Sequence, residues 1–128
     1  MEPAFLEPGE ILLIHEDQLE RYGGANGIRD LGLFQSATAM PRAGIADRYL
    51  HEDIFEMAAA YLYHIVLDHP FVDGNKRTGA VAALVFLALN DVDVTIDEDE
   101  FESEVRSVAE RTTTKSEIAD FFRENAAP

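Results

Sequence analysis

Apolar residues recur along most of the chain three and four positions apart, the spacing at which side chains share one face of an α-helix. The first segment with this spacing begins at Pro8, a favourable residue for a first helical turn, and ends at Gly23. On this helix we interpret His15 as a core histidine rather than as a ligand. The inward stripe of the helix is predicted to consist of Leu12, His15, Leu19 and Tyr22.

Further helices are predicted downstream of this first one. Pro41 is expected to end one of them, and the pair His69-Pro70 to end another, because the residue before proline is disfavoured in the helical region. The last two helices begin at segments that match capping boxes, in which an Asp or Thr is followed three positions later by Glu. The predicted ranges are 31–40, 53–68 and 75–89, with a loop over 42–50 and with the last two helices starting at Asp97 and Thr114.

The segment from Gly79 to Leu89 is apolar nearly all round, which predicts the central helix of a bundle with other helices on every side. It has about half of the ~20 residues that a membrane span needs. Residues 23–30 are rich in residues that tolerate positive φ and predict a turn or short hairpin, and the alternation over 92–96 predicts a short extended segment. We therefore predict one all-α domain over residues 1–128, a compact bundle of about six helices around a central apolar helix, with a short hairpin near 23–32.

Composition and charge narrow the functions that this domain can have. The chain has 25 acidic and 10 basic residues, a formal net charge of −15, and Lys76 and Lys115 are its only lysines. Binding to a nucleic-acid backbone requires clustered basic residues, so no direct nucleic-acid partner is expected. The absence of cysteine excludes disulfides, thiolate metal sites and a cysteine nucleophile. The acidic N-terminus is unlike a secretory signal, so we expect a cytoplasmic protein without a membrane segment.

The segment most suited to chemistry is His-Pro-Phe-Val-Asp-Gly-Asn-Lys-Arg-Thr-Gly at 69–79, which begins between two predicted helices. A histidine can accept a proton near neutral pH, an aspartate can hold a divalent cation, and lysine and arginine can pair with phosphate oxygens. The helix that starts at Gly74 and Asn75 turns its free N–H groups and its dipole toward the loop. Lys76 and Arg77 oppose that dipole, which a bound polyphosphate would offset. Each residue alone has a common structural role, but their joint occurrence favours a site.

The motif His-Pro-Phe-x-Asp-Gly-Asn-Lys-Arg-Thr at 69–78 resembles the signature of the Fic/Doc family, in its death-on-curing branch, whose members are toxins of toxin–antitoxin pairs. A second segment, 15–32, resembles the first helix of the family and the substrate-facing flap that follows it. The similarity covers about Pro8 to Phe122, and the compact all-helical fold of the family agrees with the helices predicted above.

The resemblance implies transfer of part of ATP to a hydroxyl group of a target protein. In this chemistry His69 would be the general base for the attacking hydroxyl. Asp73 would hold Mg²⁺ on the phosphates, and Phe71 would anchor the loop from inside. The implied phosphate-binding residues are Gly74 and Asn75 through their backbone, with Lys76 and Arg77 as phosphate ligands and catalytic groups that stabilise the transition state. The implied target-binding residues of the flap are Gly27, Ile28, Arg29 and Asp30, which would hold an extended segment through backbone hydrogen bonds.

Two positions distinguish this chain from the AMP-transferring members of the family, which have Gly where this chain has Lys76 and Arg where it has Ala80. Both residues match the death-on-curing toxin, which phosphorylates elongation factor Tu with the γ-phosphate of ATP. The resemblance therefore implies a Ser/Thr phosphotransferase that blocks translation. The alternatives are an adenylyltransferase and a non-catalytic module of the same fold that binds an antitoxin, a nucleotide or a partner protein.

Many members of the family carry an inhibitory helix with the pattern Ser/Thr-x-x-x-Glu-Gly/Asn, of which Thr113 and Glu117 match only the first part. Ala80 removes the arginine with which such a glutamate pairs, and a capping box explains Glu117 without inhibition. Inhibition is therefore expected in trans, by a cognate antitoxin. His51 and His64 have no partner at metal-ligand spacing and are assigned no role.

Overall fold

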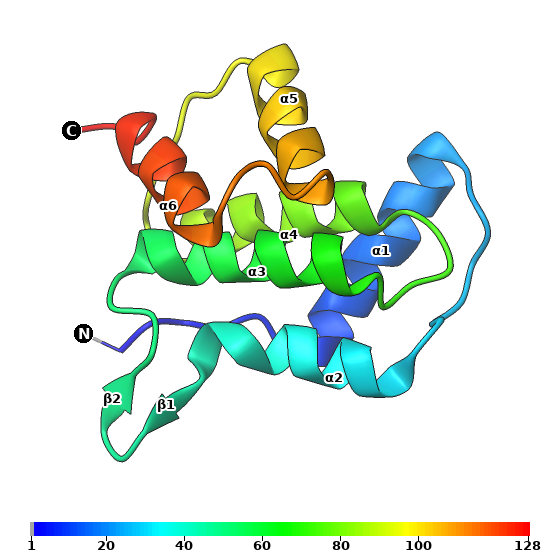
Figure 1. The fold of residues 1–128 in the computed structure, drawn as a ribbon, viewed down its shortest axis with the longest axis horizontal. Helices are drawn as coiled ribbons and strands as arrows, with labels where there is room; N and C mark the ends of the chain where they lie inside the picture. The colour runs from blue at the N-terminus through cyan, green and yellow to red at the C-terminus, as the bar shows by residue number, and fades with distance from the viewer. Residues whose placement is uncertain (1) are drawn as a thin grey trace.

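The computed structural model describes residues 2–128 and confirms the all-α prediction, with six α-helices, one 3₁₀ turn and one two-stranded hairpin over these residues (Figure 1). The elements in chain order are α1 (Pro8–Tyr22), α2 (Leu31–Ala39), the 3₁₀ turn η1 (Met40–Arg42), β1 (Gly44–Ile45), β2 (Arg48–Tyr49), α3 (Ile54–Asp68), α4 (Asn75–Leu89), α5 (Glu98–Ala109) and α6 (Lys115–Glu124). Within residues 2–128, none of these helices has the length and apolarity to cross a membrane.

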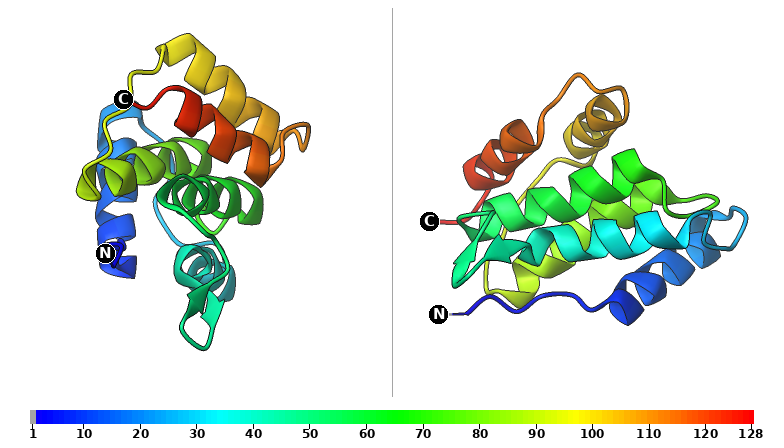
Figure 2. Two further views of the ribbon diagram at one scale, coloured as in Figure 1. Left: turned by 90° about the vertical axis from the view of Figure 1, so that its left-hand side faces the viewer. Right: turned by 60° about the horizontal axis from the view of Figure 1, so that its bottom comes forward.

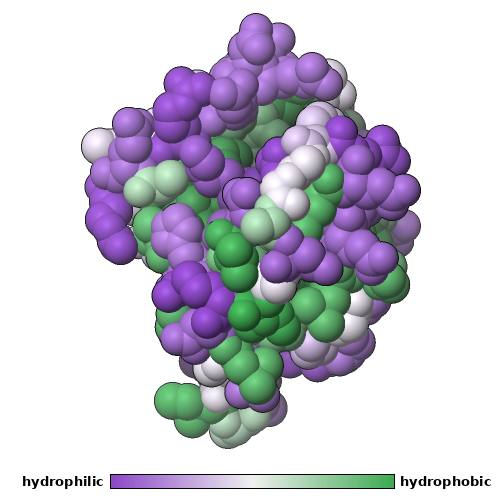
Figure 3. Space-filling view, turned by 90° about the vertical axis from the view of Figure 1, so that its right-hand side faces the viewer, coloured by the Kyte–Doolittle hydropathy of each residue, from purple (hydrophilic) through white to green (hydrophobic). Residues whose placement is uncertain are grey.

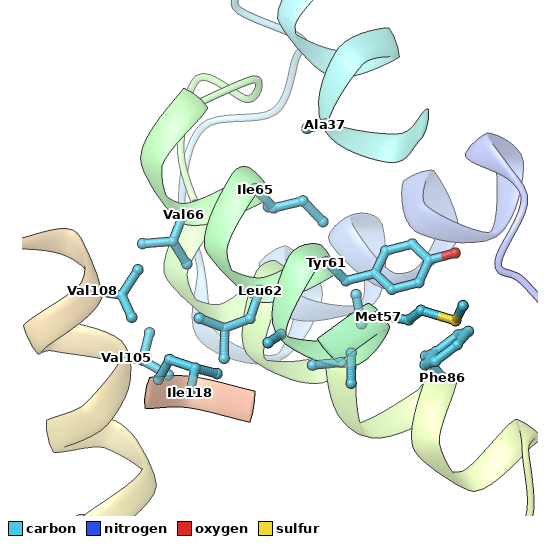
Figure 4. Close-up of a cluster of buried hydrophobic side chains, with 14 of the residues drawn as sticks. Ala37, Met57, Tyr61, Leu62, Ile65, Val66, Phe86, Val105, Val108 and Ile118 are labelled. Atoms are coloured by element: carbon cyan, nitrogen blue, oxygen red, sulfur yellow. The ribbon is translucent and has the colours of Figure 1, made fainter. Parts of the chain in front are cut away.

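The helices form layers around α3. Helices α5 and α6 lie on one side of the α3–α4 pair, and α2 with the hairpin lies on the other, while α1 crosses one end (Figure 1, Figure 2). Helix α3 contacts α2, α4, α5 and α6, and its residues from Met57 to Leu62 are all buried. Figure 4 shows α3 side chains such as Leu62 and Val66 packed against residues of α5 and α6.

The prediction that the 75–89 helix is central and covered on every side is wrong, because α3 occupies that position. Helix α4 packs one face on α3 but leaves Val85 and Leu89 38% and 47% exposed. A glycine explains the close packing of the face that contacts α3. A Cβ atom at Gly79 would lie 3.0 Å from Val66 Cγ2 and 3.1 Å from the Leu62 carbonyl oxygen. The glycine therefore lets α3 and α4 approach closely just beyond the loop that joins them.

Of the two predicted capping boxes, the one at α6 is complete and the one at α5 is half formed, with the Asp97 cap but no reciprocal bond from Glu100. The start of α3 has a cap that was not predicted. The Asp53 carboxylate accepts the Glu56 N–H at the start of α3, and the Asp97 carboxylate accepts the Glu100 N–H at the start of α5. At α6 the full capping box between Thr114 and Glu117 is present. The predicted extended segment over 92–96 contributes one antiparallel bridge, between Val94 and Ala126.

The prediction of which face of α1 is buried is wrong. The buried residues are Ile11, His15 and Gln18, whereas Leu12 and Tyr22 are exposed. The reason is that the inward face of α1 covers a polar loop as well as the apolar core, so that polar side chains belong on it. Of the predicted stripe, His15 alone is fully buried, in agreement with its interpretation as a core histidine.

The predicted surface hairpin near 23–32 is also wrong. Residues 23–30 form an extended segment that bridges at Ile28 to Phe71, far away in sequence. The hairpin of this protein is β1–β2, with Gly44 opposite Tyr49, inside the region predicted to be a loop. Glycine-rich sequence allows a tight turn but does not require one, and here hydrogen bonds to the 69–74 loop extend the segment.

Candidate active site

The 69–74 loop joins α3 to α4 at one end of the molecule, between two residues in the left-handed conformation. His69 caps the C-terminus of α3 with φ 48° and ψ 55°, and Gly74 precedes α4 with φ 79° and ψ 15°. Glycine adopts this conformation at little cost, but a histidine does so only where its surroundings impose it. The predicted helix boundaries on both sides of the motif are confirmed.

Buried side chains hold the loop from beneath. The Phe71 ring is fully buried and stacks on the His15 ring, with a centroid distance of 3.8 Å and an interplanar angle of 7°. His15 Nε2 donates to the Asp73 carbonyl oxygen at 2.8 Å. The Asn75 amide accepts the Phe71 N–H at 2.9 Å and donates to the Phe71 carbonyl at 3.0 Å. The predicted inward position of Phe71 is confirmed, and Asn75 braces the loop with its side chain, a role that the sequence did not indicate.

The loop and the first turn of α4 line an open cavity of about 370 Å³. Its lining residues are His69, Val72, Asp73, Gly74, Asn75, Lys76 and Arg77, so the structure brings the predicted residues of the motif together. The nearest polar contact of the His69 ring is Asn75 Nδ2, 3.5 Å from Nδ1. The Lys76 side chain is exposed and, within residues 2–128, takes part in no hydrogen bond or ion pair. The cavity therefore contains a cation available to a ligand, beside the N-terminus of α4.

Asp73 is the carboxylate that lines the cavity. Its carboxylate accepts the Gly74 N–H at 2.9 Å and the Ala25 N–H at 3.3 Å. A Cβ atom at Gly24 would come within 2.9 Å of Asp73 Oδ2, so the glycine makes room for the carboxylate. Within residues 2–128 no three His, Asp or Glu side chains converge on one point. Because Mg²⁺ at nucleotide sites takes one or two carboxylates and fills its other positions with phosphate oxygens and water, a single aspartate fits this ion.

Arg77 is tied to the end of α1. Its Nη2 donates to the Gly23 carbonyl at 2.8 Å, and its guanidinium lies 5.5 Å from the centroid of the Tyr22 ring. Its Nε is buried and has no hydrogen-bond partner within residues 2–128. Arg77 is thus less free to move than Lys76, and its unpaired donor is buried. The roles of both residues on phosphate stay predictions.

The flap segment pairs with the loop rather than standing apart from it. The Pro70 carbonyl accepts the N–H groups of Arg29 and Asp30, and the Val72 N–H donates to Gly27. Among the four predicted flap residues, Ile28 alone keeps both its N–H and its C=O without a partner within residues 2–128. A target strand can therefore pair with the Ile28 backbone, but not with the N–H groups of its two successors.

Two side chains of the flap bond to the ends of neighbouring helices and not to a free edge. The Arg29 guanidinium donates to the carbonyls of Asp68 and His69, and the Asp30 carboxylate caps α2 by accepting the Leu33 N–H. Apolar surface remains around the cavity, where Ile28 and Val72 are 39% and 53% exposed. Figure 3 views this end of the molecule, and hydrophobic surface gathers near its centre between hydrophilic margins.

A groove of about 560 Å³ adjoins the cavity, between α1, α4 and α5. It shares Lys76 and Arg77 with the cavity, and Ala80 lines it. Its other lining residues are Gln18, Tyr22, Val81, Leu84, Glu98, Phe101, Glu102, Val105 and Arg106. The sequence did not indicate this groove, because its walls come from three helices far apart in the chain.

The structure assembles a second polar cluster that sequence reasoning missed. Lys115 Nζ lies 3.0 Å from Nε2 of both His51 and His64. Burial, together with the positive charge of Lys115, lowers the pKa of His64 to about 4. Burial also lowers the pKa of the Lys115 ammonium. No signal in the sequence could have linked these residues, because they come from a loop, α3 and the start of α6.

Comparison with known proteins identifies the family of this chain. The family model described as the Fic/DOC family matches residues 5–87. The chain is 33% identical over 118 residues to the protein kinase doc of Escherichia phage P1, with 92% of each chain covered. It is 36% identical over 100 residues to the toxin Doc of Mycolicibacterium smegmatis, with 77% of each covered. A family match over most of the chain, with relatives that cover 92% and 77% of it, shows that this protein belongs to the Fic/DOC family.

Proposed function

We propose that this protein is the toxin of a toxin–antitoxin pair and that it transfers the γ-phosphate of ATP to a Ser or Thr hydroxyl of a target protein. The names of its relatives, a toxin and a protein kinase, support both parts. The observation that carries the proposal is one cavity in which His69, the free cation of Lys76 and the N-terminus of α4 meet. A proton acceptor beside an anion-binding helix end is the arrangement that phosphoryl transfer to a hydroxyl requires.

In this reaction the first N–H groups of α4, with Lys76 and Arg77, bind the γ-phosphate and stabilise the charge of the transition state. His69 accepts the proton of the target hydroxyl while its oxygen forms a bond to the γ-phosphorus. The bond from that phosphorus to the β–γ bridging oxygen breaks, and ADP leaves. Asp73 would hold Mg²⁺, which when bound neutralises phosphate charge. General-base catalysis of this kind contributes about 10²–10⁴-fold.

Phosphate transfer is favoured over AMP transfer by two residues of α4. Lys76 stands in the cavity where the AMP-transferring pattern has glycine, so its side chain takes room beside the phosphates. Ala80 stands where that pattern has arginine, and it lines the groove instead of the cavity. A different set of cations therefore faces the nucleotide, which supports a different orientation of its phosphates.

We propose elongation factor Tu as the target, whose modification would block translation. The target segment would pair with the free N–H and C=O of Ile28, and its hydroxyl residue would lie beside His69. The exposed apolar surface of Ile28 and Val72 would contact its side chains. The free edge is short, so affinity for the target would depend on these apolar contacts as well as on the strand pairing.

We propose that a cognate antitoxin inhibits the protein in trans. Glu117 takes part in the capping box of α6, where the Thr114 N–H lies 2.9 Å from its carboxylate, and hydrogen bonds to Thr114 lower its pKa. This role leaves the chain without an inhibitory glutamate of its own at the site. The groove that shares Lys76 and Arg77 with the cavity offers an antitoxin segment a position from which to cover both cations.

The experiment that tests the proposal incubates the protein and its His69→Ala variant with elongation factor Tu and ATP labelled in either the α or the γ phosphate. Label from the γ position alone, absent with the variant, is the expected result. Label from the α position would make the protein an adenylyltransferase. Transfer that occurs in whole-cell lysate but not to purified elongation factor Tu would identify another target. Absence of transfer in both would favour a binding module.

A further inference from the structure

We propose that Arg29 is a positioning residue for His69, which it holds in place through the backbone of the loop. The inference rests on the proposed role of His69 as general base. It reassigns Arg29, which was expected to bind the target. Its side chain turns away from the free edge of the flap and toward the end of α3.

Arg29 binds three consecutive carbonyl groups around the base. Its Nη2 donates to the Asp68 carbonyl at 2.9 Å and its Nε to the His69 carbonyl at 2.6 Å. Its backbone N–H donates to the Pro70 carbonyl at 2.7 Å. One residue of the flap therefore fixes the peptide groups on both sides of His69.

The end of α3 needs such a partner. The last carbonyls of a helix have no partner within the helix, and the negative end of its dipole favours a cation. The last turn of α3 contains no basic residue and ends in Asp68, whose carboxylate repels that end of the dipole. Arg29 supplies the missing cation and two of the missing donors from a segment that lies 39 and 40 positions away in the chain.

The conformation of His69 depends on this contact. A non-glycine residue in the left-handed region stays there only when its surroundings outweigh the cost. Within residues 2–128 the only polar contact of the His69 ring is the 3.5 Å approach of Asn75, which is too long to fix the ring by itself. The ring position therefore follows the backbone, and the backbone is held by Arg29.

The same contact connects target binding to the base. Ile28, whose backbone is free to pair with a target strand, precedes Arg29 directly. A target strand that pairs at Ile28 therefore lies next to Arg29, which is hydrogen-bonded to the His69 carbonyl. Loss of the guanidinium would leave the strand edge in place but would let the base move relative to it.

The test compares Arg29→Met and Arg29→Lys with the wild type and with a control, Arg21→Met. Arg21 is exposed on α1, and within residues 2–128 its guanidinium bonds only to Asp17 of the same helix. Since a displacement of about 1 Å can reduce turnover about 10²-fold, Arg29→Met is expected to lower kcat by about that factor. The KM for ATP should not change. Lysine keeps the charge but cannot reach both carbonyls, so Arg29→Lys should recover part of kcat, and added guanidinium ion should raise the kcat of an Arg29→Ala variant.

A second readout does not depend on turnover. Ring signals of His69 in the nucleotide-free protein, measured by NMR, should shift or broaden in Arg29→Met and stay unchanged in Arg21→Met. Wild-type kcat in Arg29→Met, or a loss confined to the KM for the target, would overturn the inference. If the wild type itself transfers no phosphate, the proposed function fails, and the NMR comparison alone decides whether Arg29 positions His69.

Discussion

Two clusters of this protein combine histidine with lysine. They differ in whether the lysine already has a hydrogen-bond partner within the fold. In the cavity at the end of α3, His69 and Lys76 are exposed, and Lys76 has no polar partner within residues 2–128. In the cluster between α3 and α6, Lys115 Nζ lies 3.0 Å from two imidazole nitrogens, those of His51 and His64. Lys76 in the first cluster is free to bind a ligand, whereas Lys115 in the second is already hydrogen-bonded to the two histidines.

The difference shows that residue type alone does not make a site. The Lys115 cluster has the more perturbed ionisation, with the pKa of His64 lowered to about 4 by burial. Lys115 Nζ and the Nε2 atoms of both histidines are nevertheless occupied with one another, although the buried His51 Nδ1 has no partner within residues 2–128, so the lowered pKa reflects packing. The cavity is identified as a candidate site by a different feature. The N-terminus of α4, the Lys76 ammonium and the His69 imidazole all face one open volume. Unsatisfied groups directed at a shared space distinguish the candidate active site.

Replacing one histidine from each cluster tests this distinction, and it has the largest expected effect. His69→Ala should reduce phosphate transfer by about 10²–10⁴-fold, the range for loss of a general base. His64→Gln, in the other cluster, should leave transfer unchanged near neutral pH. The rate of label transfer from γ-labelled ATP is the measurement. Equal losses in the two variants would contradict the distinction.

Replacing the lysine of each cluster by alanine should give the next largest effect. Lys76→Ala removes the free cation of the cavity and should lower kcat/KM for ATP on the order of 10²-fold, as loss of one group that stabilises transition-state charge does. Lys115→Ala is the matched control, and its kinetics should equal those of the wild type. A normal kcat/KM in Lys76→Ala would show that Arg77 and the helix N-terminus suffice for phosphate.

The close packing that supports the loop can be tested with two glycines. Gly79→Ala places a methyl group against Val66 and the Leu62 carbonyl, and should destabilise the fold by about 1–3 kcal/mol, the usual cost of overpacking. Gly9→Ala in α1 has no atom within 4 Å of its new methyl group. It should stabilise the fold by about 0.5–1 kcal/mol, because alanine restricts the unfolded chain. Urea denaturation midpoints measure both effects, and similar midpoints would contradict the account.

The closed cluster should be visible in the pH dependence of stability. Folded His64 stays neutral down to pH about 4, whereas in the unfolded chain it takes up a proton near its ordinary pKa of 6.5. Between these values the unfolded state binds more protons, so stability falls as pH decreases from 6.5 toward 4 and gains nothing from His64 above 6.5. Since His64 is partly exposed, we expect about 1–2 kcal/mol.

His64→Gln should remove that part of the pH dependence, as measured by urea unfolding between pH 4 and 7. A wild-type stability that does not fall over this interval would mean that His64 can become protonated without unfolding, and that Lys115 moves away from it.

The sequence by itself determined the helices and the chemistry of the motif. Helix boundaries follow from residues a few positions apart, such as Pro8 at the start of α1 and the capping box of Thr114 and Glu117. The motif over 69–78 contains its groups in consecutive positions, and the helix N-terminus beside them is equally local. Family membership could therefore be predicted from this segment.

Only the tertiary structure decided how these parts meet. Contacts between segments far apart in the chain decide which face of α1 is buried and that α3 is central. They also bring together His51, His64 and Lys115. The contact of Arg29 with the end of α3 was likewise decided by the tertiary structure, because the family resemblance implied that this residue binds the target. Local patterns determine which residues can form a helix, a cap or a loop. Packing determines which of their remaining hydrogen-bonding groups are used within the fold and which stay free for a ligand.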